Sequence, residues 1–225
     1  MLMLALILVL IPAPIPAPIP IRSIMLSALG LAPTALLSAY PDNLLELLKR
    51  SLETRRSSNP AITERKMALG QGDALPKVAV KVMGEKGPED LNIGEFAADK
   101  KVVIFAVPGA FTPTCSAAHL PGFVANADKI KAKGVDAIIC LSVNDAFVMN
   151  AWGSAQNAEE LIMAGDGNGD FTAAMGLTLD GSGFGLGQRS SRYALIAENG
   201  VITQLNAEQG GAFEVSSAEA IMEVL

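Results

Sequence analysis

The apolar run over residues 102–107 (VVIFAV), followed at once by the loop PGAFTPTC and then by helical spacing, constrains the fold more than any other stretch. A run of β-branched, aromatic and small apolar residues indicates a buried strand. Pro108 and Pro113 stiffen the loop, because each fixes φ and removes a backbone donor. Cys115 therefore lies at a strand-to-helix junction. The free N–H groups and the dipole of a first helical turn favour the thiolate there, which is the nucleophilic form of cysteine.

Strands alternate with helices along the rest of the chain. Strands are predicted over residues 77–83, 135–143, 161–164, 192–198 and 201–206, the last two joined by the turn pair Asn199-Gly200. Helices are predicted over residues 91–96, over 115–131 with a kink at Pro121, from Asn144 or Asp145 to about 157, from Asp170, and after Ser217. Residues 181–187 are predicted to form a mobile loop. The alternation predicts an α/β domain over residues 67–225, with a mixed central sheet flanked by helices.

Charge and cysteine content exclude several classes of function. The net charge of −6, with no basic stripe, argues against a nucleic-acid partner. Cys115 and Cys140 form no CxxC pair, which disfavours a disulfide framework and a thioredoxin-type disulfide oxidoreductase. His119 is the single histidine, and we expect it to pack on the helix face that Cys115 shares. The residues therefore predict chemistry without a metal or a cofactor, in a reducing compartment.

Residues 1–66 form an extension in which Lys and Arg outnumber Asp and Glu, although the whole chain is acidic. A basic leader on an acidic domain is typical of a targeting segment. Three interpretations remain open. The extension is an organellar transit peptide, for a plastid or mitochondrion; the apolar residues 1–11 are a membrane or secretory signal; or the start is mispredicted, and a cytoplasmic protein begins at Met67.

The segment PGAFTPTCSAAHLPGF, which starts at Pro108, resembles the active-site signature of the peroxiredoxins, and in particular of the Prx5 or plant type II subfamily. The subfamily pattern of Pro, three residues, Thr, two residues and Cys is met by Pro108, Thr112 and Cys115. A looser resemblance extends over residues 70–225. It implies a thioredoxin fold and a thiol-dependent peroxidase in which peroxide oxidises Cys115 to a sulfenic acid.

The resemblance also implies roles for individual residues. Cys115 would attack the peroxide, Thr112 would direct its hydroxyl to the peroxide and the sulfur, and Pro108 would shield the sulfur from bulk water. The family places an arginine before an aromatic residue at the start of a late strand, and the segment SRYALI meets this pattern with Arg192. Arg192 would stabilise the thiolate and donate to both peroxide oxygens, with Arg189 as its rival.

The identity of the resolving thiol remains open. Cys140 lies 25 positions after Cys115, the spacing at which plant type II members place their second cysteine. The Prx5 branch places its resolving cysteine near the C-terminus, where this chain has VSS at residues 215–217, so that route is ruled out. Cys140 lies in a predicted buried strand, where a free cysteine is usually a small hydrophobe, and a disulfide with Cys115 would require local unwinding. Either Cys140 or an external glutathione or glutaredoxin thiol resolves the sulfenic acid.

These predictions combine into an antioxidant peroxidase for hydrogen peroxide and alkyl hydroperoxides, with glutaredoxin and glutathione, or thioredoxin, as the reductant. The resemblance further implies a homodimer, formed around Phe111 and the region of Trp152. A peroxide sensor that relays oxidation from Cys115 to a partner protein is the alternative function, because it would use the same residues.

Overall fold

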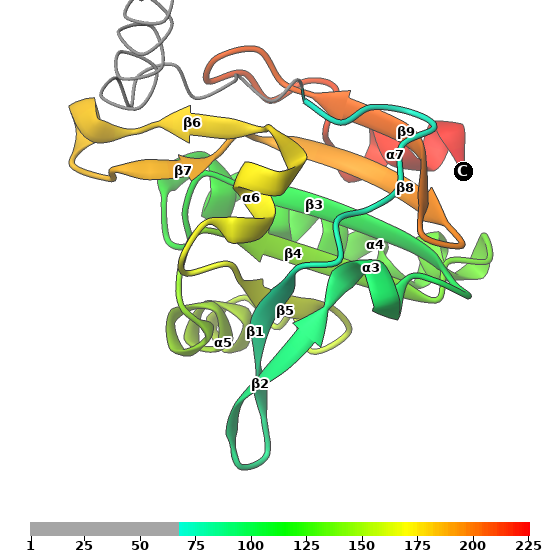
Figure 1. Ribbon diagram of the computed structural model, residues 1–225, viewed down its shortest axis with the longest axis horizontal. Coiled ribbons are helices and arrows are strands. Elements are labelled where there is room, and N and C mark those ends of the chain that lie inside the picture. The colour runs from blue at the N-terminus through cyan, green and yellow to red at the C-terminus, as the bar shows by residue number, and fades with distance from the viewer. Residues whose placement is uncertain (1–67) are drawn as a thin grey trace, which may run out of the picture. The chain divides into compact units, whose positions relative to one another are not determined.

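A mixed β-sheet of seven strands forms the centre of the structure, a computed structural model that describes residues 68–225 (Figure 1). Its strands are β1 (Ala79–Gly84), β2 (Gly87–Asn92), β3 (Lys101–Val107), β4 (Ala137–Ser142), β5 (Ile162–Gly165), β8 (Tyr193–Glu198) and β9 (Val201–Ala207), in the order β2-β1-β5-β4-β3-β8-β9. Strands β3, β4 and β5 pair in parallel. The other four pairings of this sheet, β2 with β1, β1 with β5, β3 with β8 and β8 with β9, are antiparallel. The predicted N-terminal extension and the alternative start at Met67 lie outside the described residues.

Strands β3 and β4 are buried along nearly their whole length, as their apolar sequences predict. All of β4 is buried, and so is all of β3 after Lys101. Successive side chains of a strand point to opposite faces. Phe105 therefore packs on one face of the sheet and Ile104 on the other. A strand covered on both faces needs apolar residues throughout. The buried strands predicted at 102–107 and 135–143 are confirmed.

Helices cover both faces of this sheet and complete a three-layer arrangement (Figure 1). They are α3 (Ile93–Phe96), α4 (Leu120–Ala132), α5 (Ala146–Ala155), α6 (Asp170–Met175) and α7 (Ala218–Val224). Helices α4, α5 and α7 pack on the face that holds Phe105, and α3 and α6 pack on the opposite face. Asp145 caps α5, because its side chain accepts a hydrogen bond from Val148 N. Ser217 caps α7 in the same way by accepting from Ala220 N, so both caps agree with the prediction. The predicted α/β architecture is confirmed.

The hairpin of β8 and β9 brings a late part of the chain to the end of β3. Its turn residues Asn199 and Gly200 have φ angles of 52° and 76°, both positive as the tight hairpin turn requires. Strand β8 runs antiparallel to β3, with Tyr193 opposite Ala106. The residue before Tyr193 is Arg192, so the register sets Arg192 beside the point where the chain leaves β3.

A second, two-stranded sheet was not predicted. It consists of β6 (Thr178–Asp180) and β7 (Gln188–Ser190). The loop predicted at residues 181–187 connects these strands, and it contains a 3₁₀ turn and a backbone hydrogen bond of 2.8 Å from Gly181 N to Gly187 O. Within residues 68–225, no helix has the length and apolar character needed to cross a membrane.

Candidate active site

Cys115 occupies the first turn of the helix that follows β3. Pro113 and Thr114 already have helical geometry, and residues Cys115–His119 form a single π-helical turn that leads into α4. Leu120 N donates to Cys115 O across this turn. Pro121 has no N–H, and in a continuous α-helix its ring would clash with the carbonyl four residues earlier. We predicted a kink at Pro121; the structure has the π turn immediately before it, and such turns are frequent at functional sites.

The Cys115 sulfur is fully buried and faces a guanidinium group. Arg192 Nη1 lies 3.6 Å from Cys115 Sγ, and only 6% of the Arg192 surface is exposed. Arg189 is committed elsewhere, because its Nε donates to Leu186 O at 2.8 Å and its Nη1 donates to Val143 O at 2.9 Å. The structure thus brings Arg192, and not Arg189, to the sulfur.

The loop between β3 and Cys115 is held by its own polar groups and by Asn144, which follows β4. Thr112 Oγ1 donates to Gly109 O at 2.8 Å, so the hydroxyl proton is already used and the oxygen is left to accept. Ala110 N donates to Asn144 Oδ1 at 3.0 Å, which ties the loop to the residues after β4. Pro108, at the start of the loop, is half-buried. Of the two predicted caps, Asp145 is the one that caps α5, and Asn144 holds this loop instead.

His119 lies against Arg192, in addition to the packing that we expected for it. The distance from Arg192 Nη1 to His119 Nδ1 is 3.0 Å, and His119 Nε2 lies 2.9 Å from Ser216 O. Burial lowers the pKa of His119 to about 3, and the positive charge of Arg192 acts in the same direction. The ring also packs against Phe105 and Phe213, each with a centroid separation of 5.0 Å. Its spacing of four residues from Cys115 was the one sequence signal for this position.

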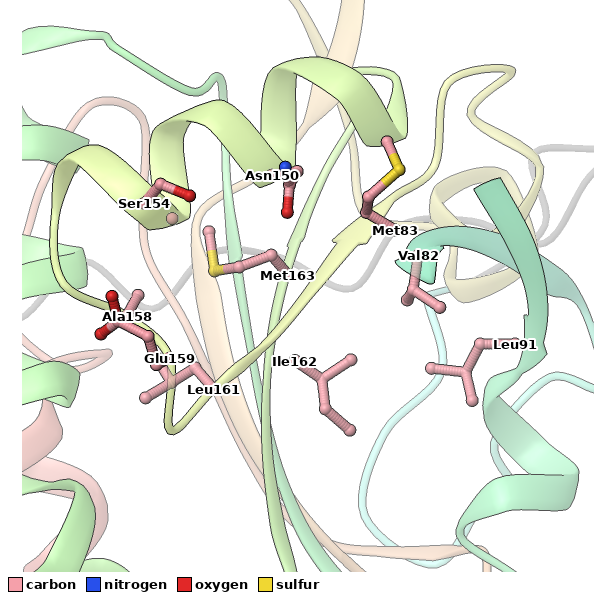
Figure 2. A pocket seen from close by; sticks show the side chains of 11 residues that line it. Val82, Met83, Leu91, Asn150, Ser154, Ala158, Glu159, Leu161, Ile162 and Met163 are labelled. Carbon is pink, nitrogen blue, oxygen red and sulfur yellow. The ribbon is translucent and has the colours of Figure 1, made fainter. Parts of the chain in front are cut away.

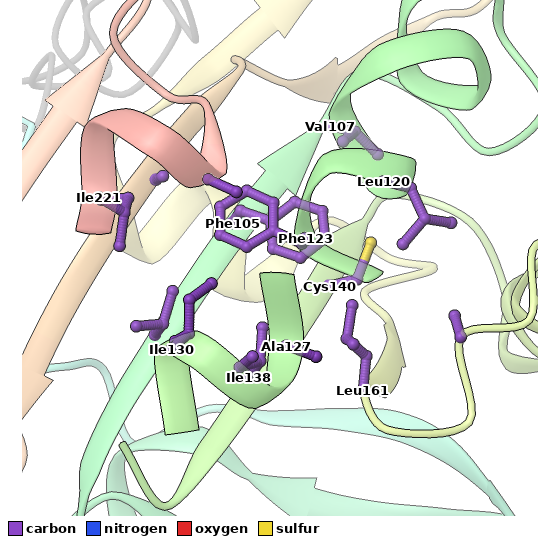
Figure 3. Close-up of a cluster of buried hydrophobic side chains, with 14 of the residues drawn as sticks. Phe105, Val107, Leu120, Phe123, Ala127, Ile130, Ile138, Cys140, Leu161 and Ile221 are labelled. Carbon is purple, nitrogen blue, oxygen red and sulfur yellow. The ribbon is translucent and has the colours of Figure 1, made fainter. Parts of the chain in front are cut away.

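Cys140 is also fully buried, but its surroundings are apolar (Figure 3). It lies in β4 opposite Phe105 of β3, within a cluster that includes Leu120 and Phe123. Burial raises the pKa of Cys140 well above its ordinary value, and the nearby Cys115 adds to the effect. Both cysteines are free thiols in the structure. At neutral pH Cys140 is therefore a protonated thiol inside the core.

A cavity of about 500 Å³ lies apart from these residues, between the β1–β2 hairpin, α5 and β5 (Figure 2). Its walls are mainly apolar, with Met83 of β1, Leu91 of β2 and Met163 of β5 among the lining side chains. It contains neither cysteine, and none of the residues around Cys115 line it. In the part of the chain that the structure describes, no group of three or more His, Cys, Asp and Glu side chains is placed to hold a metal.

Comparison with known proteins gives a consistent result. The family model described as Redoxin matches residues 70–222. The chain is 40% identical over 210 residues to peroxiredoxin-2E, chloroplastic, of Arabidopsis thaliana, a match that covers 87% of this chain and 90% of that protein. It is 47% identical over 156 residues to peroxiredoxin-2D of the same plant, covering 68% and 96%. Reduced Prx3 from Vibrio vulnificus in complex with H₂O₂ superposes with a TM-score of 0.68 at 55% identity, over 69% of this chain and 98% of that one.

Proposed function

This chain belongs to the Redoxin family, as a peroxiredoxin of the Prx5 or plant type II kind, and is a thiol peroxidase; we infer that it reduces hydrogen peroxide and alkyl hydroperoxides through a sulfenic acid at Cys115. The observation that supports this assignment most directly is the Arg192 guanidinium 3.6 Å from a buried sulfur in a first helical turn. A fixed positive charge and a helix N-terminus both favour the thiolate over the thiol.

The chemistry follows from the groups around the sulfur. The thiolate of Cys115 attacks one peroxide oxygen, so the S–O bond forms as the O–O bond breaks, and the leaving oxygen takes up a proton to give water or an alcohol. Thr112 Oγ1 donates its proton to Gly109 O, which leaves its lone pairs to accept a hydrogen bond from the hydroperoxide O–H. Arg192 donates to the oxygens on which negative charge develops. Pro108 limits the access of water to the sulfur.

The sulfenic acid is then reduced by a thiol, and we propose that this thiol is external. Attack by Cys140 would require the turn at Cys115 to unwind, because Cys140 is fully buried in β4 and protonated. Glutathione with glutaredoxin, or thioredoxin, can reach Cys115 from outside once the loop opens. Regeneration by a disulfide between Cys115 and Cys140 is the competing route.

Intact mass and a free-thiol count on the full chain, after one equivalent of hydrogen peroxide without reductant, test both statements. We expect the loss of one thiol with the gain of one oxygen, and no change in the Cys115→Ser variant. The Cys140→Ser variant is the matched control and should be oxidised like the unchanged protein. Peroxide consumption by Cys115→Ser would contradict the assignment of the nucleophile. Loss of both thiols within one monomer would instead identify Cys140 as the resolving residue.

We also propose that the chain forms a homodimer through the surface around Phe111. Phe111 and Phe147 are large apolar side chains with 57% and 64% of their surface exposed, and the Phe111 ring lies 6.3 Å from that of Trp152. Exposed aromatic residues next to a buried one are typical of interface centres. Sedimentation of the Phe111→Ser, Phe147→Ser variant should show a monomer where the unchanged protein shows a dimer.

For localisation we propose a plastid, because two relatives carry the description chloroplastic, at 40% and 47% identity. Residues 1–66 would then be removed on import. N-terminal sequencing of the mature protein tests this. A mature chain that begins at Met1 would contradict it, and one that begins at Met67 with no import would favour the cytoplasmic alternative.

A further inference from the structure

The side chain of Arg192 has few partners for a buried charge. Its Nη1 contacts Cys115 Sγ and His119 Nδ1, whereas its Nε has no hydrogen-bond partner. The Phe213 ring lies 5.7 Å from its Cζ atom, within the range of a cation–π contact. The ion pairs found between residues 68 and 225 all join lysines to carboxylates, and none involves Arg192. His119 is therefore the main group that orients the guanidinium toward the sulfur.

The contacts of His119 determine its tautomer. Ser216 O is a carbonyl and can only accept, so His119 Nε2 carries the proton of the 2.9 Å contact. An arginine can only donate, so His119 Nδ1 accepts from Arg192 Nη1 at 3.0 Å. Both contacts are satisfied only by a neutral imidazole with its proton on Nε2. The lowered pKa of His119, near 3, is consistent with a neutral ring at physiological pH.

A second residue fixes the carbonyl that selects this tautomer. Glu208 Oε1 accepts from Ser216 N at 2.9 Å and from Ser216 Oγ at 2.8 Å, and it also accepts the backbone N–H groups of Glu214 and Val215. Glu208 N in turn donates to Arg192 O at 2.9 Å. One carboxylate thus holds the loop that supplies Ser216 O and the Phe213 ring. This loop starts at Glu208, so its first residue is joined by a hydrogen bond to the backbone of Arg192.

We propose that His119 is a positioning residue of the peroxidase, which holds Arg192 against Cys115 through Nδ1 while Ser216 O, placed by Glu208, keeps the proton on Nε2. The proposal rests on the peroxidase function proposed above. It links the reactivity of Cys115 to a C-terminal loop that contains no cysteine. Two variants separate the two contacts of the ring. In His119→Asn an oxygen can take the place of Nδ1, and in His119→Gln an N–H can take the place of Nε2.

The first measurement is the second-order rate constant for hydrogen peroxide, by stopped flow, on full chains. Hydrogen bonds to charged groups are stronger than those between neutral groups. The rate constant should therefore fall by about tenfold or more in His119→Gln and His119→Phe, and should stay within about threefold of the unchanged protein in His119→Asn. The rate constant should fall less in Glu208→Gln than in His119→Gln. Equal rates for His119→Gln and the unchanged protein would overturn the proposal, and so would equal losses in His119→Asn and His119→Phe.

The second measurement needs no peroxide. The rate of Cys115 alkylation by iodoacetamide against pH, with Cys115→Ser as the blank, should move to higher pH in His119→Gln and keep its midpoint in His119→Asn. A purely structural role would lower the melting temperature and leave this profile in place. If the unchanged protein did not consume peroxide, the proposed function would fail, but the alkylation profile would still test the contact between His119 and Arg192.

The third measurement reads the tautomer in the unchanged protein and depends on no variant. The chain has one histidine, so an untagged sample labelled with ¹⁵N-histidine gives the two ring signals of His119 alone. We expect Nε2 with a bound proton and Nδ1 without one at pH 7. A cationic ring, or a proton on Nδ1, would overturn the proposal.

Discussion

Cys115 and Cys140 lie on the same face of the sheet and are both fully buried, but they differ in secondary structure and in the charge of their neighbours. Cys115 is in a first helical turn with a guanidinium 3.6 Å from its sulfur. Cys140 is inside a strand, with apolar neighbours and a raised pKa. Burial by itself favours the neutral thiol. For a buried cysteine, the charged groups beside the sulfur therefore determine whether the thiolate is favoured over the thiol.

The largest expected effect comes from making the surroundings of Cys115 more like those of Cys140. Replacing Arg192 by Leu removes the charge beside the sulfur, and the rate constant for peroxide should fall by about 10²–10³-fold, as for other preorganised donors. Arg192→Lys should recover only part of this rate, because a single ammonium group cannot serve Cys115 and His119 with the same geometry. Stopped-flow measurement of peroxide consumption checks both values.

Arg189→Lys is the matched control for this experiment. Arg189 is only three positions away, but it donates to the carbonyls of Leu186 and Val143 and does not reach the sulfur. The control should retain the rate constant within about tenfold, because lysine can keep one of these contacts. A larger loss in Arg189→Lys than in Arg192→Lys would contradict the assignment of Arg192.

A smaller effect is expected at Thr112, whose hydroxyl oxygen we propose accepts a hydrogen bond from the peroxide. Thr112→Val removes an acceptor without changing the shape of the side chain, and the rate constant should fall by about tenfold to a hundredfold. Thr112→Ser keeps the hydroxyl and should remain close to the unchanged protein. A Val variant as fast as the Ser variant would show that the hydroxyl does not contact the peroxide in the reaction.

Local patterns predicted most of what separates the two cysteines. The apolar runs of β3 and β4, the turn pair Asn199-Gly200 and the cap Asp145 each act over a few residues, so the sequence displays them directly. The signature around Cys115 predicts this residue as the nucleophile, and the family pattern points to Arg192, which the structure places 3.6 Å from the sulfur. The choice between Arg192 and Arg189 required the register of β8 on β3, which depends on tertiary pairing.

The unpredicted features depend on contacts between distant residues. Strand β2 has the sequence GPEDLN, whose proline and acidic residues suit the edge of a sheet and show no strand pattern. His119 meets the carbonyl of a residue 97 positions away, and Glu208 meets backbone groups that no motif marks. Hydrogen bonds of this kind have no periodicity, so residue spacing does not reveal them.

The smallest expected effect concerns Cys140 and appears only at high pH. Its folded-state pKa lies well above the ordinary value of 9.0 because of burial, so the native state keeps a proton that the unfolded state releases. The unfolded state then binds fewer protons, and the free energy of unfolding falls as pH rises above about 9, by up to about 1.4 kcal/mol per pH unit. Below about pH 8 this residue contributes no pH dependence. Denaturant unfolding at pH 7, 8, 9 and 10, in a Cys115→Ser background, measures the slope.

The matched variant Cys140→Ala, in the same background, isolates this contribution. It should be less stable at every pH because of the cavity, and its slope between pH 9 and 10 should be smaller by about one proton. The window closes near pH 10, where Tyr193 begins to act in the same direction, because burial raises its pKa well above the ordinary value of 10.0 and the charge of Asp166 adds to the shift. Equal slopes in the two proteins would mean that Cys140 ionises as freely in the native state as in the unfolded chain. Cys140 would then be available as a resolving thiol, and the contrast with Cys115 would reduce to the position of Arg192.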